Sequence, residues 1–255
     1  LLSTASYVTS LGRPMGKKTT RFKRTLLKIS GEALMGKGNY GIDPETLKGV
    51  ADEIKDVHDK GVQIAVVIGG GNIFRGLNSS SYGMKRAPAD HMGMLATVIN
   101  ALALGEALNN EGLETRIMSA IDMNKVAEPF IRKRAISHLN KGRVVLFGGG
   151  TGNPFFSTDT AAALRAMEID AEVLLKATNV EGVYERDPKD DPSLKPFKTL
   201  TYREYIERGL KVMDMTAITL AMGHNLPVLV FSLKERGNIL KVVTENDVGT
   251  LITGD

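Results

Sequence analysis

The chain has 255 residues, of which 42% are apolar and 24% are charged, a balance typical of a folded globular protein rather than a disordered or fibrous one. Because it contains no cysteine, disulfides, thiolate metal sites and cysteine nucleophiles are excluded. No apolar run in the sequence approaches the ~18 residues of a membrane span, so we expect no association with a membrane.

The formal net charge of +4 originates at the N-terminus. Residues 1–24 contain six Lys and Arg and no acid, which leaves a net charge of −2 for residues 25–255. This near-neutral body gives no reason to expect nucleic-acid binding. Residues 1–14 precede Met15 and lack the apolar core of a signal peptide. We therefore expect them to be a disordered remnant of cloning, followed by one cytoplasmic domain over residues 15–255.

Strand and helix patterns alternate along the chain. The first strand is predicted at 25–29, and the first helix at 44–60, where Asp43 is a suitable N-cap and Pro44 a suitable first residue. This alternation predicts an α/β fold with a mainly parallel central sheet. The further strands are predicted at 62–68, 143–147, 173–176, 228–231 and 250–253. The further helices are predicted at 89–110, 128–139, 158–167 and 215–223.

Glycine or other small residues follow three of these strands, at 69–71, 148–150 and 177–179. Ligands of parallel α/β sheets bind beyond the carboxyl ends of the strands. Small residues at those ends allow a ligand to approach the backbone. The sequence therefore predicts a binding site at this edge of the sheet.

The segment 31–38 (GEALMGKG) imitates a P-loop without completing it. Its last position is glycine instead of the hydroxyl residue that ligates magnesium, and no helix is predicted after it. Lys28, in the strand before the Ser30-Gly31 turn, is the better candidate for a phosphate contact. The alternative is a surface lysine on an edge strand, and this segment alone does not decide between the two.

Two glycine-rich segments are candidate anion sites. In residues 69–76 (GGGNIFRG), the glycines can bring backbone N–H groups to an anion, and Arg75 adds a planar cation. The alternative there is a tight turn with a solvated arginine. Residues 148–159 (GGGTGNPFFSTD) add Phe155 and Phe156, which either shape a pocket for a planar base or belong to the core. Thr158 or Asp159 at the end of this segment can cap the next helix.

Residues 176–187 (KATNVEGVYERD) mix small polar side chains with an aromatic and an acidic one. Thr178 and Asn179 can form hydrogen bonds, and Tyr184 and Asp187 offer a flat surface and an acceptor for ribose hydroxyls. This mixture suits a nucleoside, but the same stretch taken alone is also an ordinary turn.

Two aspartates and one helix complete the candidates. Asp90 and Asp214 lie where helices are predicted to begin, and their default role is to complement the helix dipole. The helix over 92–108 is apolar nearly all round, so it must be buried on several sides. We interpret it as a subunit contact, with burial under a loop as the alternative.

Six motifs occur in order: KISGEAL (28–34), IGGGNIFRG (68–76), DHMGMLAT (90–97), GTGNPFFSTDTAA (150–162), KATNVEGVY (176–184) and KVMDMTA (211–217). Together they resemble the amino acid kinase family, and within it the bacterial enzymes that phosphorylate uridylate (UMP), over about residues 24–254. The resemblance implies a three-layer αβα sandwich, assembled as a hexamer, that transfers the γ-phosphoryl group of ATP to UMP in pyrimidine nucleotide biosynthesis.

The resemblance also implies the site residues. The ATP site is formed by Lys28, Ile29, Ser30, Gly31, Gly71, Arg75, Thr178, Asn179, Tyr184 and Asp187. The UMP site is formed by Gly70, Asp90, Thr151, Gly152, Asn153, Pro154, Phe155, Phe156, Ser157 and Thr158. The catalytic set, with two aspartates that organise magnesium and the charged groups, is Lys28, Arg75, Asp159 and Asp214. The region of GTP activation is Gly36, Lys37, Gly38, Asn39, Tyr40 and Gly41.

The implied partners are Mg²⁺ carried by the ATP phosphates, GTP as activator, UTP as inhibitor, and no nucleic acid. Phosphoryl transfer needs positioning and charge neutralisation more than covalent catalysis. A phosphate monoester has a second pKa near ~6 and is mostly a dianion at neutral pH, so no general base is required. Where several amino-acid-phosphorylating relatives have a second catalytic lysine, this chain has Asp214.

Two other functions compete with this one. The same fold can phosphorylate a carboxylate or carbamate, against which the aromatic pair at 155–156 and the DHMGM segment argue. A nucleotide-binding regulator or storage assembly is the non-enzyme alternative. The presence of Lys28, Arg75 and Asp214 together disfavours it.

Overall fold

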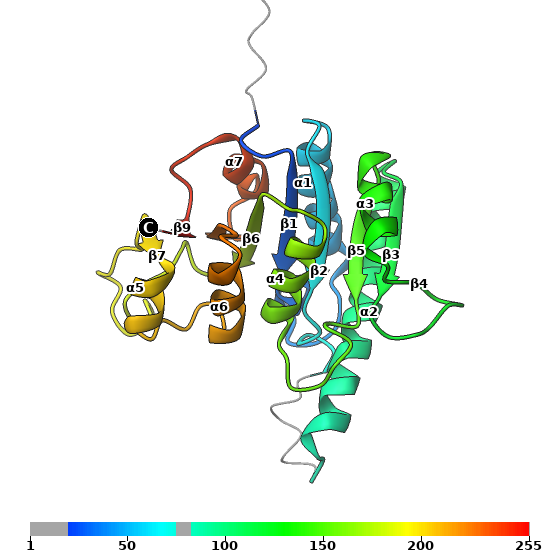
Figure 1. Cartoon of the computed structure of the whole chain (residues 1–255), viewed down its shortest axis with the longest axis horizontal. Coiled ribbons are helices and arrows are strands. Elements are labelled where there is room, and N and C mark those ends of the chain that lie inside the picture. The colour runs from blue at the N-terminus through cyan, green and yellow to red at the C-terminus, as the bar shows by residue number, and fades with distance from the viewer. Residues whose placement is uncertain (1–19, 75–82, 255) are drawn as a thin grey trace, which may run out of the picture.

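The apolar runs of the sequence form one sheet in the computed structural model, which describes residues 20–74 and 83–254 (Figure 1). Within these residues the sheet has nine strands in the order β4–β3–β5–β2–β1–β6–β8–β9–β7. Neighbouring strands are parallel except for the antiparallel pair β8 and β9. The strands are β1 (Arg24–Ile29), β2 (Gln63–Ile68), β3 (Thr115–Ser119), β4 (Glu128–Pro129), β5 (Val144–Gly148), β6 (Val173–Thr178), β7 (Thr199–Thr201), β8 (Val228–Ser232) and β9 (Thr250–Thr253).

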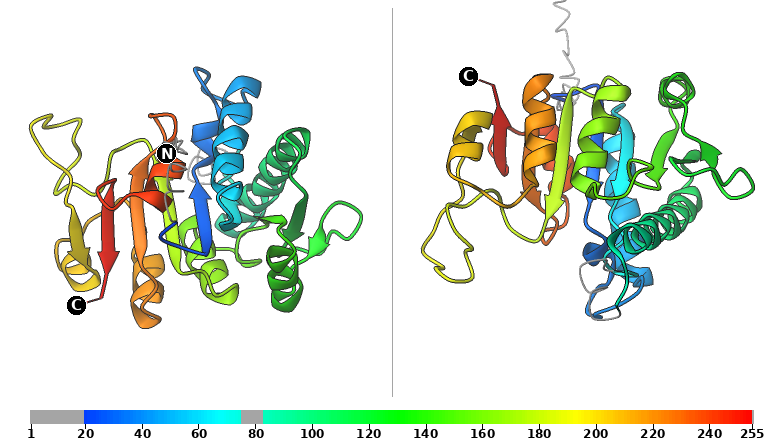
Figure 2. Two further views of the ribbon diagram at one scale, coloured as in Figure 1. Left: turned by 90° about the horizontal axis from the view of Figure 1, so that it is seen from above. Right: turned by 60° about the horizontal axis from the view of Figure 1, so that its bottom comes forward.

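Helices cover both faces of the sheet, as the left view of Figure 2 shows. Helices α1, α2 and α7 pack on one face, and α3, α4, α5 and α6 pack on the other. The expected three-layer αβα sandwich with a mainly parallel sheet is therefore confirmed. The helices are η1 (Gly31–Leu34, 3-10), α1 (Pro44–His58), α2 (Arg86–Asn110), α3 (Arg132–Asn140), α4 (Thr158–Glu168), α5 (Tyr202–Glu207), α6 (Met215–Gly223) and α7 (Asn238–Thr244).

The central strands are apolar because both of their faces are covered. Along β1, Leu26 belongs to the core layer that packs on α4, and Leu27 belongs to the layer that packs on α1. Since side chains alternate across a strand, Lys28 is placed on the α4 side. It is only 8% exposed, which excludes the alternative of a surface lysine on an edge strand.

The helix expected over 128–139 was partly wrong. Glu128 and Pro129 form the edge strand β4 beside β3, and α3 begins only at Arg132. Proline is tolerated at a sheet edge, where its missing N–H costs no ladder hydrogen bond. Besides β4, the elements that the sequence did not predict are short or polar: η1, β3, β7, α5 and α7.

Helix α2 combines a buried face with an exposed apolar one. Among the described helices it alone is long and apolar enough to cross a membrane by length and composition, but half of its most apolar window is buried inside the protein. Core helices pass the same test, so this is weak evidence for a membrane segment. Within a single chain, the expected burial on several sides is reached only in part. The other face exposes four large apolar side chains: Met92, Leu95, Ile99 and Leu102.

The topology separates the loops at one edge of the sheet. The chain passes from β1 to α1 and from β2 to α2, both on the α1 face of the sheet. It passes from β5 to α4, and from β6 through β7 to α5, both on the α4 face. Neighbouring strands whose connections depart to opposite faces leave a crevice at their carboxyl ends. Two such crevices are expected here, between β1 and β6 and between β2 and β5.

Candidate active site

Two lysines lie side by side where β1 and β6 end. Lys28 and Lys176 are register partners of the two parallel strands, and both belong to the α4 side of the sheet. Lys28 is 8% exposed and Lys176 is 6% exposed. Two like charges so close together in the core require an acidic partner.

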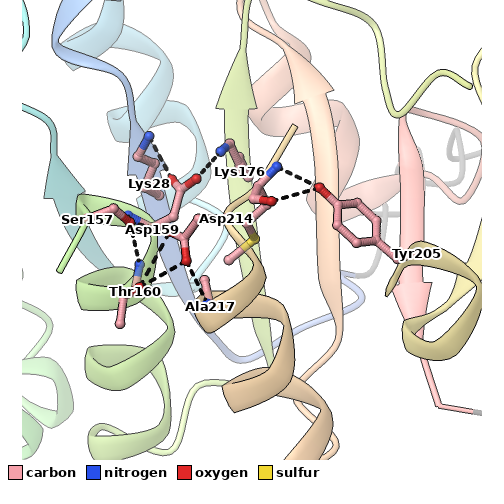
Figure 3. A network of polar contacts seen from close by, with 9 residues as sticks. Lys28, Ser157, Asp159, Thr160, Lys176, Tyr205, Asp214 and Ala217 are labelled. Carbon is pink, nitrogen blue, oxygen red and sulfur yellow. Dashed lines mark hydrogen bonds and ion pairs between the residues drawn. The ribbon is translucent and has the colours of Figure 1, made fainter. Parts of the chain in front are cut away.

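Asp159, the second residue of α4, is that partner (Figure 3). Its Oδ1 lies 2.9 Å from Nζ of Lys28, and its Oδ2 accepts a hydrogen bond from Nζ of Lys176. Burial alone would raise the pKa of Asp159, but the attraction of Lys28 and Lys176 outweighs burial and lowers that pKa to about 2. Burial lowers the pKa of Lys176, and Asp159 opposes that shift. We call Lys28, Asp159 and Lys176 the ionic cluster.

The N-termini of α4 and α6 are tied together beside this cluster. Ser157, rather than the expected Thr158 or Asp159, caps α4 by accepting from the backbone N–H of Thr160. Its own hydroxyl donates to Asp214. Asp214 in turn caps α6 by accepting from the N–H of Ala217 at 2.9 Å. The hydroxyl of Thr160 donates to Oδ1 of Asp214 at 3.1 Å. Asp214 thus has the capping role expected by default, and it also fixes the end of the glycine-rich loop.

A buried tyrosine holds the segment that carries Asp214 (Figure 3). The hydroxyl of Tyr205 accepts from the N–H of Met213 at 2.7 Å and donates to the carbonyl of the same residue. Burial raises the pKa of Tyr205 to about 12. The phenol therefore stays neutral and keeps its proton for this contact.

The first pocket, of about 380 Å³, opens at the ends of β2 and β5 beside α2 and α4. At the bottom of the pocket the backbone of Gly70 packs closely against α2. Only glycine fits at this position, because a Cβ on residue 70 would lie 2.7 Å from the carbonyl oxygen of Gly93. The residues that line it include Gly70, Gly71, Arg86, Asp90, Thr97, Gly150, Phe156, Ser157 and Thr158.

The loop at the mouth of this pocket is exposed and anchored by Asp90. The carboxylate of Asp90 accepts from the N–H of Phe155 at 2.7 Å and pairs with Arg86, one turn earlier in α2. Phe155 has a left-handed backbone with φ of 74°, a conformation that costs energy for an aromatic residue. It is 66% exposed and Phe156 is 51% exposed, so neither ring belongs to the core of this chain.

The second pocket, of about 580 Å³, lies beyond β6 on the other side of the ionic cluster. Tyr184 and Asp187 line it, as do Lys211 and Val212 from the segment before Asp214. Thr178 and Asn179 precede the lining residue Val180 in the chain but are not part of the wall. The first pocket therefore lies at the expected crevice between β2 and β5, whereas the second lies among the loops that follow β6 rather than between β1 and β6.

Comparison with known proteins shows the family to which the chain belongs. Residues 23–232 match the amino acid kinase family. The chain belongs to the amino acid kinase family. Among solved structures it is similar to the UMP kinase from Bacillus anthracis, with 41% identity, a TM-score of 0.89, and coverage of 92% of this chain and 97% of that chain.

Two further solved structures are similar over nearly their whole length. The UMP kinase from Ureaplasma parvum shares 36% identity at a TM-score of 0.86, with 91% of this chain and 99% of that chain covered. The uridylate kinase from Archaeoglobus fulgidus shares 30% identity at a TM-score of 0.70, with 90% and 99% covered. The family resemblance read from the six motifs is therefore confirmed.

Some expected site residues of this family member lie apart from their assigned pocket. Gly71, assigned to ATP, lines the first pocket, although its N–H also borders the turn after β1, 2.9 Å from where a Cβ of Gly31 would be. Of the expected UMP loop, Phe156, Ser157 and Thr158 line the first pocket, whereas residues 151–155 form the turn beside it. Arg75 lies outside the described residues.

The P-loop imitation is not a P-loop in three dimensions. After η1 the chain continues in turns to α1, without the helix that a P-loop requires directly after its lysine. Lys37 is exposed there. The loop 36–41 is held against the glycine-rich turn after β2, because Gly41 exchanges two hydrogen bonds with Asn72.

Three side chains of the site were not among the sequence candidates. The sequence did contain a signal that could have identified Lys176, because VLLKAT at 173–178 repeats the pattern of TLLKIS at 25–30. Thr97 accepts from the N–H of Gly149 at 2.8 Å and so joins α2 to the turn after β5. Arg86 pairs with Asp90 at helical spacing. The contact of Thr97 depends on the crossing of α2 over β5, whereas the pair of Arg86 and Asp90 is local and depends on α2 beginning at Arg86 rather than at residue 89.

Proposed function

We propose that this chain is a UMP kinase that transfers the γ-phosphoryl group of ATP to UMP, giving ADP and UDP for pyrimidine nucleotide biosynthesis. The observation that carries the proposal is the buried ionic cluster, with one pocket beyond β2 and β5 and another beyond β6. Thr158, next to Asp159, lines the first pocket, and Val180, which follows the strand of Lys176, lines the second. Two UMP kinase structures at 36% and 41% identity support the choice of reaction.

The first pocket is proposed to hold UMP. The expected contacts are Asp90 with the ribose hydroxyls and the loop 151–158 with the uracil and the acceptor phosphate. Asp90 already holds Phe155 and Arg86, and a carboxylate has lone pairs for a further donor. In this arrangement Asp90 contacts the ribose of the nucleotide and also holds the strained, exposed loop that closes on that nucleotide. Phe156 lines the pocket and offers an apolar surface to a planar base.

The second pocket is proposed to hold the adenosine part of ATP, with its phosphates directed to the carboxyl end of β1. Tyr184 and Asp187 offer a ring face and a hydroxyl acceptor in that pocket. Lys28, Ile29, Ser30 and Gly31, together with Thr178 and Asn179, lead from it to the transfer centre along the ends of β1 and β6.

The chemistry proposed for the centre is charge neutralisation. UMP attacks as a phosphate dianion, so no group has to remove a proton. Lys28, Arg75 and backbone N–H groups stabilise the charge that spreads over the transferred phosphoryl oxygens. The eleven-residue helix α4 begins beside the first pocket and adds the positive end of its dipole. Asp159 and Asp214 organise these cations rather than react themselves.

We further propose that Mg²⁺ arrives on the ATP phosphates. Among the described residues no three His, Cys, Asp or Glu side chains are grouped as a metal site. Asp159 binds two lysines, and Asp214 accepts from two hydroxyls and one N–H. Magnesium in kinases is held largely by phosphates and one or two carboxylates, so this donor set fits an ion carried by ATP, which would supply additional positive charge between the phosphates.

The exposed apolar face of α2 is proposed to pack against a second copy of this chain in a homo-oligomer, a hexamer by resemblance. Its four side chains repeat at helical spacing and are 36–48% exposed within one chain. Covering such a stripe gains apolar burial. Light scattering is expected to give a multiple of 27.6 kDa, and a monomer at micromolar concentration would contradict the oligomer.

We also propose activation by GTP through Gly36–Gly41 and inhibition by UTP, in a cytoplasmic enzyme with one domain over residues 15–255. The loop touches the turn of the first pocket through Gly41 and Asn72, which gives a route for an effect on turnover. The check is the initial rate against GTP concentration at subsaturating ATP. A flat rate would count against GTP activation.

The decisive test of the function compares three acceptors side by side. The purified protein is incubated with Mg²⁺, ATP and either UMP, CMP or N-acetylglutamate, and the phosphorylated product is measured together with ADP. We expect UDP and ADP in equal amounts, with far slower turnover of the other two. Preference for the carboxylate would favour the amino-acid-phosphorylating alternative, and no turnover of any acceptor would favour a regulator.

A further inference from the structure

Lys176 places its amino group in the core without a part in the transfer described so far. It is 6% exposed, and among the contacts found within the described residues its Nζ binds only Asp159. A lysine at this depth loses much of its hydration, which an apolar side chain of similar length would not. Packing alone therefore does not account for a lysine here.

The charges around Asp159 suggest what Lys176 contributes. Lys28 and Lys176 bring two positive charges, and Asp159 and Asp214 bring two negative ones, with Asp214 near enough to affect the protonation of Lys176. The charges of these four groups sum to zero. Without Lys176 the same centre would be net negative, and it would repel the phosphates of ATP.

The geometry also divides the two oxygens of Asp159. Lys176 occupies Oδ2 and Lys28 is paired with Oδ1. If Lys176 were absent, both carboxylate oxygens of Asp159 could bind Lys28. Lys28 and Asp159 would then form an ion pair with no net charge. A cation in such a pair is less able to turn toward a new anion.

We propose that Lys176 is a positioning residue of the phosphoryl transfer, which holds Asp159 so that the ammonium group of Lys28 can turn to the transferred phosphoryl group. The inference rests on the proposed function, and it adds a second buried lysine from β6 in place of the one that some relatives have near Asp214. Lys176 acts through Asp159 and Lys28 and forms no bond to the substrates.

The first test is Lys176→Met, which keeps the length of the side chain and removes its charge. We expect kcat for UDP formation to fall by about 10²-fold, in the range found for a lost preorganised charge contact. KM for UMP is expected to stay within about threefold, because no lining residue of the first pocket changes. The control is Lys60→Met, which removes the same charge from an exposed position just before β2. Lys60 lies at the amino ends of the strands, away from the ionic cluster, so this change should leave kcat unchanged.

The second test restores the charge balance. In Lys176→Met/Asp159→Asn the centre again has equal positive and negative charges, and the amide oxygen introduced at position 159 is still able to accept from Lys28. We expect kcat at least tenfold above that of Lys176→Met, whereas a role in packing alone would predict no gain. If Lys176→Met does not fold, as judged by its melting curve, the double variant decides: kcat within about tenfold of the wild type supports the proposal, and kcat lower than that overturns it.

These outcomes are separate from those for the proposed function. If the wild-type protein does not form UDP, the function itself fails. If the wild type forms UDP and Lys176→Met is as fast, or if its loss is not relieved by Asp159→Asn, only the role of Lys176 is overturned.

Discussion

The ionic cluster and the loop 151–158 differ in how far the protein alone has organised them. Lys28, Asp159 and Lys176 are each at most 9% exposed and are paired with one another, on two central strands and a helix. The loop exposes Phe155 and Phe156 by more than half and holds one of them in a strained conformation. The fold thus builds the charges for transfer into its core and leaves the acceptor contacts on an exposed surface turn. Changes in the cluster should lower kcat, whereas changes around the loop should raise KM.

The largest effect is expected for Lys28→Ala. Loss of a preorganised cation should lower kcat/KM for UMP by about 10²–10³-fold, or ~3–4 kcal/mol. Because Asp159 then keeps only Lys176 as a partner, the melting temperature should also fall. Lys28→Arg should restore only part of the rate, since a longer planar group does not replace a compact ammonium. Steady-state kinetics and thermal melts measure both effects, and a loss below about threefold would place the transferred phosphate elsewhere.

The cluster should also leave a signature in acid. The pKa of Asp159 is lowered from its ordinary value of 3.8 to about 2 in the folded protein. Its stabilising effect is therefore complete above the unfolded-state pKa and is lost as pH falls through the folded-state pKa. The free energy of unfolding of the wild type, relative to Asp159→Asn, should decline between about pH 4 and pH 2. Denaturant unfolding at several pH values checks this, and a constant difference would contradict the ion pairs.

A smaller change is expected for Asp90→Asn on the loop side of the comparison. The amide oxygen still accepts from the N–H of Phe155, but the charge available to ribose hydroxyls and to Arg86 is lost. KM for UMP should rise by about tenfold, or ~1.4 kcal/mol, with little change in kcat. If kcat falls instead and KM stays constant, Asp90 belongs with the transfer centre and the division between the two regions is wrong.

No effect is expected from deletion of residues 1–14, which lie outside the described residues. Their sequence has no pattern that would pack against the domain. The truncated protein should have the same kcat and melting temperature as the full chain. A clear fall in either quantity would show that this segment takes part in the folded protein.

The sequence was sufficient for the frame of the fold because the frame depends on local patterns. Central strands covered on both faces are continuously apolar, and α1 begins where Asp43 and Pro44 predict. The elements that it did not predict, such as β7 and α5, are only three and six residues long and depend on contacts with distant strands. The split of residues 128–139 into β4 and α3 likewise depends on pairing with β3.

The site was foreseen in its parts but not in its pairings. Lys28, Asp159 and Asp214 could be singled out by position after a strand or before a helix. That Asp159 joins Lys28 to Lys176 depends on the register of β1 with β6 and on the packing of α4 across them. No local pattern carries that information, although the repeated Leu-Leu-Lys was a hint that Lys176 resembles Lys28.

The most direct test of the transfer centre compares two lysines that lie nine positions apart in the chain. Lys28 is buried beside Asp159, and Lys37 is exposed on the loop that imitates a P-loop. The measurement is UDP formation at saturating ATP and UMP by Lys28→Ala and Lys37→Ala. The account predicts that Lys37→Ala retains turnover and Lys28→Ala loses most of it. Abolished turnover in Lys37→Ala together with a nearly unchanged Lys28→Ala would contradict it.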